Sequence, residues 1–107
     1  MNPAFFPYND EGFSSFQAWC AEAMDSLSAM RHELERRHQL AGRSLEDVLL
    51  EHTPEGCIEA VECFAEDMKC VESDPSPSAF YRFQVYSRAR LLMQAQIYQL
   101  ELDRTES

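Results

Sequence analysis

The apolar residues in the first third of the chain recur at alternating intervals of three and four. They are Phe13, Phe16, Cys20, Ala23, Leu27, Met30 and Leu34. This spacing keeps one side of an α-helix apolar over about six turns. It predicts a long helix that begins near Asn9 or Asp10, and it excludes a strand over this whole stretch because strands alternate with a period of two.

The ends of this helix carry their own signals. Asn9 is a good N-cap, and Tyr8 is placed to pack on Phe13 as a hydrophobic staple. The basic run 36–38 suits the negative end of the helix dipole. Gly42 is expected to supply the stop.

Two shorter helices are predicted next. Ser44 starts the first, which ends near Thr53, and Thr53 then caps a third helix with Pro54 at its first position. One side of this third helix should be buried: Cys57, Ile58, Val61, Phe64, Ala65, Met68 and Val71. The other side is acidic and should be solvated: Glu55, Glu59, Glu62, Glu66 and Asp67.

The last helix follows a proline- and serine-rich linker at residues 73–78. Ser76 caps it, Pro77 takes its first position, and it runs to about Leu102. It is apolar on two opposed sides. One side holds Phe83, Tyr86, Ala89, Met93, Ile97 and Leu100, and the other holds Phe80, Leu91, Tyr98 and Leu102. Such a helix must bury both sides, either among its own neighbours or against another chain.

These elements predict an all-α fold for a single domain over residues 1–107: a small helical bundle of two long and two shorter helices. Each long helix, at about 28 residues, is roughly 42 Å long. A compact domain of this size is only about 34 Å across. The long helices therefore overrun a globule, and we expect a second copy to complete the bundle as a homodimer.

Charge excludes several function classes. The net charge is −10, and residues 44–74 alone carry ten acidic residues and one lysine. Binding to nucleic acid requires a basic patch, and so does adsorption to an anionic membrane. We expect neither, and no stretch reaches the length of a membrane span or resembles a secretory signal. A cytoplasmic location follows as an expectation.

The cysteines Cys20, Cys57, Cys63 and Cys70 are expected to be free thiols in a reducing cytosol. No C-x-x-C pair occurs, and Cys63 and Cys70 are about 10 Å apart along a helix, so we expect no metal site and no cofactor. His32, His38 and His52 lie in no nucleophile or metalloprotease motif. The chain is therefore not expected to be an enzyme or to have a small-molecule substrate.

Two features point instead to protein binding. The N-terminal arm Met1–Tyr8 has three aromatic residues, two prolines and no charge, so it should dock on its own core or on a partner. The second feature is the additional apolar side of the last helix, which its own neighbours or another chain must cover. The candidate residues for a partner or dimer interface are Phe5, Phe6, Tyr8, Phe80, Leu91, Tyr98 and Leu102.

The opening Met-Asn-Pro-Ala-Phe-Phe-Pro-Tyr, the acidic helical character and the closing helix Ser-Ala-Phe-Tyr-Arg-Phe-Gln-Val-Tyr-Ser-Arg-Ala-Arg resemble the QslA-type quorum-sensing anti-activators of pseudomonads. The resemblance covers the whole chain. It implies a regulator that binds the ligand-binding domain of a LuxR-type transcription factor and blocks its dimerisation and DNA binding.

Two other functions stay open. The acidic block between Glu55 and Asp74 is also compatible with a nucleic-acid mimic that occupies a basic groove of another protein. A secretion-type chaperone would instead bind an extended segment of its client. Salt distinguishes the nucleic-acid mimic from the anti-activator. A complex held by acidic residues weakens steeply as ionic strength rises, whereas one held by buried apolar surface hardly responds.

Overall fold

The computed structural model describes residues 5–106 and contains four helices over that range. They are α1 (Asp10–His38), α2 (Leu45–His52), α3 (Glu55–Glu72) and α4 (Pro77–Thr105). Residues 5–106 form no strand. The predicted all-α fold with two long and two shorter helices is thus confirmed. The arm residues Met1–Ala4 lie outside the described part.

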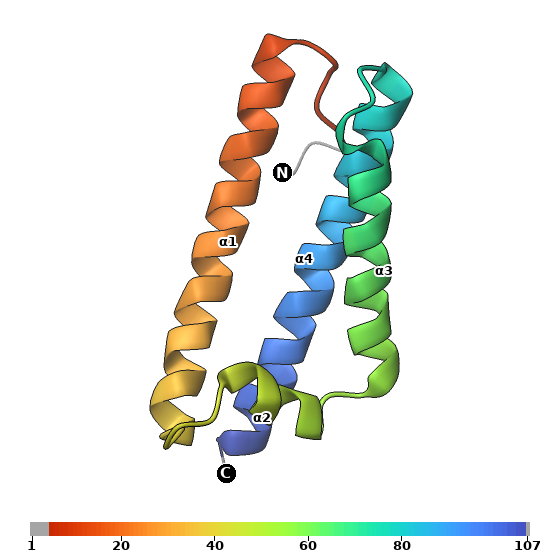
Figure 1. The fold of residues 1–107 in the computed structure, drawn as a ribbon. Coiled ribbons are helices and arrows are strands. Elements are labelled where there is room, and N and C mark those ends of the chain that lie inside the picture. Colours follow the sequence, from red (N-terminus) through yellow and green to blue (C-terminus); the bar gives the residue numbers. More distant parts are fainter. Residues whose placement is uncertain (1–4, 107) are drawn as a thin grey trace.

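The long helix α4 is the centre of the arrangement. Both α1 and α3 pack mainly on α4 rather than on each other, and α2 crosses one end of the bundle (Figure 1). The molecule measures 46 × 25 × 24 Å. Its longest dimension is that of a 29-residue helix, so the expectation that the long helices overrun a globule is confirmed. None of the described helices is both long enough and apolar enough to cross a membrane.

Three of the predicted caps are present. The side chain of Asn9 accepts a hydrogen bond from the backbone N–H of Gly12 at 2.7 Å. Ser44 and Ser76 do the same for the N–H groups three residues on, each at 3.1 Å. The rings of Tyr8 and Phe13 meet edge to face, as expected for the staple.

Two predicted helix ends are wrong. Pro54 is itself the N-cap of α3 and Thr53 does not cap it, because Thr53 closes α2 through its N–H to the carbonyl of Leu49 at 2.8 Å. At the end of α1, the left-handed residue is Gln39 (φ 45°) and Gly42 lies beyond the helix, in the connecting loop. The chain must reverse within residues 39–44 for α2 to fold back against α1, and this reversal starts before the glycine.

A fully buried leucine cluster lies at the end of the bundle that α2 covers. Leu34 of α1 meets Leu45 and Leu49 of α2, and all three are buried. Leu40, Ile97, Tyr98 and Leu102 pack around them. Arg37 ties the same end together, since its guanidinium donates to the carbonyl of Leu102 at 3.0 Å. We refer to this region as the closed end.

Candidate interaction groove

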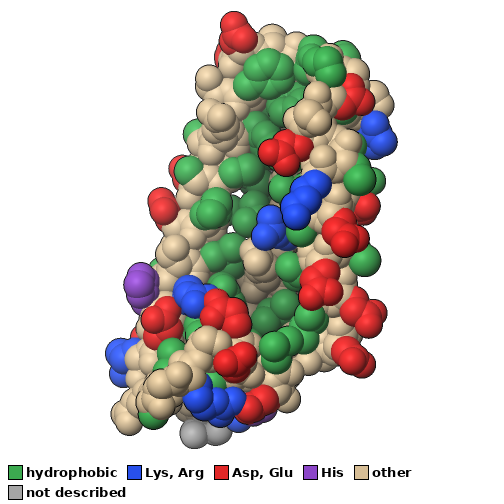
Figure 2. Space-filling model, in the orientation of Figure 1, with side chains coloured by type: hydrophobic (Ala, Val, Ile, Leu, Met, Phe, Trp, Pro, Cys, Tyr) green, Lys and Arg blue, Asp and Glu red, His purple; other side chains and the backbone are tan. Residues whose placement is uncertain are grey.

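An apolar groove runs between α1 and α3, with α4 as its floor. It consists of two adjoining hollows of about 550 and 430 Å³, which share Cys20, Met24 and Phe83. Figure 2 shows hydrophobic side chains along the gap between α1 and α3, with basic side chains among them. The groove exists because α1 has no buried residue between Phe16 and Leu34. Its middle turns lie beside α4 with one flank uncovered.

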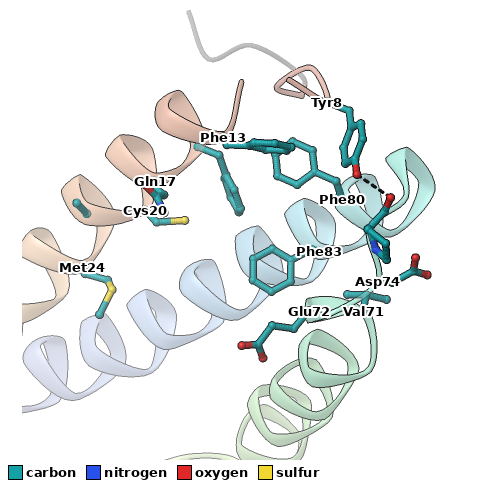
Figure 3. Close-up of a pocket in the computed structure, with 13 residues that line it drawn as sticks. Tyr8, Phe13, Gln17, Cys20, Met24, Val71, Glu72, Asp74, Phe80 and Phe83 are labelled. Atoms are coloured by element: carbon teal, nitrogen blue, oxygen red, sulfur yellow. Dashed lines mark hydrogen bonds between the residues drawn. The ribbon is translucent and has the colours of Figure 1, made fainter. Parts of the chain in front are cut away.

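The first hollow is lined by aromatic rings. Phe13 and Phe16 of α1 meet Phe80 of α4 at centroid distances of 4.9 and 5.6 Å, in edge-to-face geometry. Phe83 meets Phe16 in the same way at 5.8 Å. Figure 3 shows the rings of Phe13, Phe80 and Phe83 between α1 and α4, with Glu72 at the end of α3 and Asp74 just beyond it. This is the side of the groove next to the N-terminus of α1.

The arm residues described by the structure dock on their own helices at this side. The buried side chain of Gln84 makes two hydrogen bonds to the backbone of Phe6: it accepts from the N–H at 2.8 Å and donates to the carbonyl at 3.1 Å. The Tyr8 hydroxyl donates to the carbonyl of Pro75 at 2.7 Å (Figure 3). Gly12 permits the close approach, because a Cβ there would lie 1.8 Å from the carbonyl oxygen of Pro7.

The second hollow is lined mainly by apolar side chains, and two buried polar atoms lie among them. It is lined by Leu27 of α1, Met68 of α3 and Leu91 of α4, among others. Ser87 also lines it and is only 3% exposed, yet its hydroxyl has no hydrogen-bond partner. The buried Nε of Arg90 is likewise without a partner.

The other arginine that lines this hollow, Arg31, already forms ion pairs with acidic side chains of the same chain. Arg31 pairs with Glu46 at 2.6 Å and with Glu35 at 3.2 Å. The hydrogen bond to Glu46 raises the pKa of Arg31 and lowers that of Glu46. Across residues 5–106 Arg90 forms no ion pair. It is therefore the cation of the groove that remains available to a ligand.

A buried carboxylate, Glu101, lies at the closed end. Arg104 holds it at 2.5 Å, and ring nitrogens of His38 and His52 lie 3.4 and 3.1 Å from its oxygens. Burial raises the pKa of Glu101, but the hydrogen bond and charge of Arg104, helped by the two histidines, outweigh it and leave the pKa below its usual range. This cluster joins the ends of α1, α2 and α4.

The predicted interface residues divide between four places. Phe5, Phe6 and Tyr8 lie on the arm, where Phe5 contacts Tyr81 and Phe6 contacts Phe16, each with its ring tilted against the other. Phe80 belongs to the aromatic cluster, Leu91 and Tyr98 line the second hollow, and Leu102 packs on the closed end. The structure thus brings Leu91 and Tyr98 together in the groove, while Phe80 and Leu102 lie far apart on the helix.

The sequence analysis missed a third side of α4. Tyr81, Val85 and Leu92 are exposed and line neither hollow of the groove; Leu92 is 70% exposed. Their spacing of four and seven residues places them within about 40° of one another on a helix. That spacing was readable in the sequence, but the larger apolar sets on the flanks of the same helix concealed it. We refer to these three residues as the outer stripe.

The four cysteines are free, in agreement with the prediction. Burial raises the pKa of the Cys20 thiol, against the opposing charge of Arg88, so Cys20 behaves as an apolar lining residue of the groove. Among the described residues, no group of three or more histidine, cysteine or acidic side chains is placed to hold a metal ion.

No family model, curated protein or solved structure matches the chain. The proposal that the protein binds another protein therefore depends on the groove, its lining and its charges, and the proposed partner depends on the resemblance seen in the sequence.

Proposed function

We propose that this protein acts in the cytoplasm by binding another protein, without catalysing a reaction. In detail, it is an anti-activator that binds the ligand-binding domain of a LuxR-type transcription factor and blocks the dimerisation needed for DNA binding. The resemblance described above supplies the partner. The observation that supports protein binding is the groove between α1 and α3, which exposes an apolar floor over much of the length of α4.

The size of the exposed apolar side chains supports this function. Met24, which belongs to both hollows, is 60% exposed, and Phe13 at the aromatic side is partly exposed as well. Covering a large apolar side chain contributes roughly 1.5–3 kcal/mol. A contiguous apolar surface of this kind is typical of an interaction site.

A homodimer is compatible with this function because α4 offers two separate surfaces. The groove lies on one side of α4 and the outer stripe of Tyr81, Val85 and Leu92 on another. We propose that the outer stripe contacts the second copy and that the groove receives the transcription factor. Dimerisation then leaves the partner site open.

Two neighbouring leucines provide a matched test. Leu91→Glu puts a charge into the groove, and Leu92→Glu puts the same charge on the outer stripe one residue away. Each variant and the wild-type chain are mixed with purified ligand-binding domains of pseudomonad LuxR-type factors. Light scattering after size exclusion gives the mass of each species. A gel-shift assay with the full-length factor then measures DNA binding.

We expect the wild-type chain to abolish DNA binding by at least one of these factors. Leu91→Glu should lose this effect and remain a dimer, whereas Leu92→Glu should keep it and become a monomer. Circular dichroism on the same samples must show both variants folded. If no LuxR-type domain binds the wild-type chain, the proposed partner is wrong.

The acidic side of α3 favours a second candidate, the nucleic-acid mimic. Glu55, Glu59, Glu62 and Glu66 are all exposed. A basic partner held by this surface should dissociate when salt rises from about 0.05 to 0.5 M, since the Debye length falls well below 10 Å. A complex formed through the groove should persist over that range.

A further inference from the structure

We propose that the groove binds an amphipathic α-helix of the partner, and that this helix carries an acidic residue that pairs with Arg90. This inference rests on the proposed protein-binding function and adds the chemistry of the segment that is recognised. Three observations carry it: the shape of the groove, its unpaired polar atoms, and the charges along its length.

The shape is that of a helical bundle with one position vacant. Two helices flank the groove, a third forms its floor, and the two flanking helices do not pack closely on each other. Apolar residues line it from the aromatic side to Tyr98, with a few polar side chains such as Ser87 and Arg90 among them. An α-helix of about 10 Å diameter is the element that fills such a position in four-helix bundles. Helix-in-groove binding uses the same geometry.

The polar atoms specify what the helix must bring. The hydroxyl of Ser87 and the Nε of Arg90 are buried in the second hollow and lack partners. Because these donors are already shielded from water, leaving them unpaired is unfavourable. A carboxylate is the group that satisfies both, because it accepts from a guanidinium and from a hydroxyl at once.

The charges of the groove also set the spacing between an acidic and a basic residue on the docked helix. Glu72 and Asp74 lie at the far side of the first hollow, where α3 ends and α4 begins. Arg90 is thirteen residues beyond Pro77, or roughly 20 Å along α4. A docked helix with its acid at Arg90 therefore suits a basic residue about 13–14 positions away, next to Glu72 and Asp74.

A second copy of this chain is the other possible occupant of the groove. A two-fold axis brings only the residues that lie on it face to face with themselves, and the two hollows meet at Cys20, Met24 and Phe83 rather than at Arg90. The mass of Leu91→Glu in solution distinguishes the two occupants, because a second copy seated in the groove would be released by this charge.

The test is a selection from a phage-displayed library of stabilised helical peptides of about 18 residues, randomised without charge bias. The target is the full-length chain, either wild type or with Arg90→Glu. Counter-selection against Leu91→Glu removes peptides that bind elsewhere. Synthetic peptides from each pool are then titrated by fluorescence anisotropy, each beside a version with its central acid changed to Gln or Lys.

We expect wild-type selection to enrich an acidic residue in an otherwise apolar face, and Arg90→Glu selection to enrich a basic one. Changing the acid to Gln should weaken binding to the wild-type chain about tenfold or more. The same change should have little effect on binding to Arg90→Gln, which also serves as the folding control for the charge reversal. Enrichment without an acidic residue, or no binder that Leu91→Glu blocks, overturns the inference.

Two results separate this inference from the proposed function. A LuxR-type domain that binds wild type and Arg90→Glu equally well refutes the inference and leaves the function standing. Peptides that follow the charge rule while no LuxR-type domain binds refute that partner and keep the inference. If Leu91→Glu converts a wild-type dimer to a monomer, a second copy occupies the groove and the inference is wrong.

Discussion

The closed end and the groove share helices α1 and α4, but α2 covers the closed end, whereas α3 only flanks the groove. At the closed end α2 covers Leu34, and Glu101 is surrounded by Arg104, His38 and His52. Along the groove nothing among the described residues takes the place of α2, and the Ser87 hydroxyl and the Arg90 Nε are buried without partners. At the closed end the Glu101 Oε2 and the His38 Nε2 also lack a hydrogen-bond partner, although both residues belong to the ion-pair cluster. The two regions therefore differ in how their apolar surface is covered, which is complete over Leu34 and incomplete along the groove.

The comparison predicts different costs for the same substitution at two sites of α1. Leu34→Ala removes a fully buried side chain at the closed end and should lower the free energy of unfolding by about 2–5 kcal/mol. Leu27→Ala, two turns earlier and half-buried in the groove, should cost only about 1 kcal/mol. Urea unfolding followed by circular dichroism measures both. Equal losses would mean that the groove is as well packed as the closed end.

Glu101 predicts how the closed end responds to acid. Its pKa in the folded protein is below that of an unfolded glutamate, so its stabilising effect is complete above the unfolded value of about 4.3 and is lost as the pH falls through the folded value. Glu101→Gln should therefore lower the free energy of unfolding by about 1–3 kcal/mol at pH 7. The gap to wild type should narrow below about pH 5.

Denaturant unfolding at several pH values measures this gap. Glu59→Gln, an exposed site on α3, is the control and should show no such gap. A gap for Glu101→Gln that widens toward acid would contradict the assignment.

The arm provides the smallest expected effect. Gln84→Ala removes both hydrogen bonds to Phe6, and we expect a loss of about 1 kcal/mol, because the freed backbone of the arm returns to water. Limited proteolysis should then cut near residues 5–8 while α1 to α4 stay protected. Gln96→Ala, at an exposed position of the same helix, should leave the arm intact. Protection of the arm in both variants would show that ring contacts alone hold it.

The sequence predicted the helices well because each carried a local signal. The three-four spacing of α1 and the caps Asn9, Ser44 and Ser76 depend on neighbours within one turn. The errors at Thr53 and Gly42 arose where one residue could serve two helices, or where the path of the chain set the end of a helix. Such choices depend on how α2 packs.

The groove could be predicted only in part. The second apolar side of α4 was visible, and it did contain Leu91 and Tyr98. Periodicity could not show that Phe80 and Leu102 of the same side are covered by α1 and α2, since that depends on where these helices lie. The unpaired state of Arg90 was also invisible, because a partner for an arginine is found in three dimensions and not along the chain.

The distribution of buried residues on α1 has a mechanical consequence. The helix is packed near Phe16 by the aromatic cluster and near Leu34 by the closed end, and none of the seventeen residues between them is buried. Helix α1 is thus held by buried contacts near both ends and not in its middle. Helices bend gently at little cost, so α1 can bow outward or inward without releasing either support. Bending of α1 would then change the width of the groove. A bound helix would restrict the motion of the middle of α1 more than that of its ends.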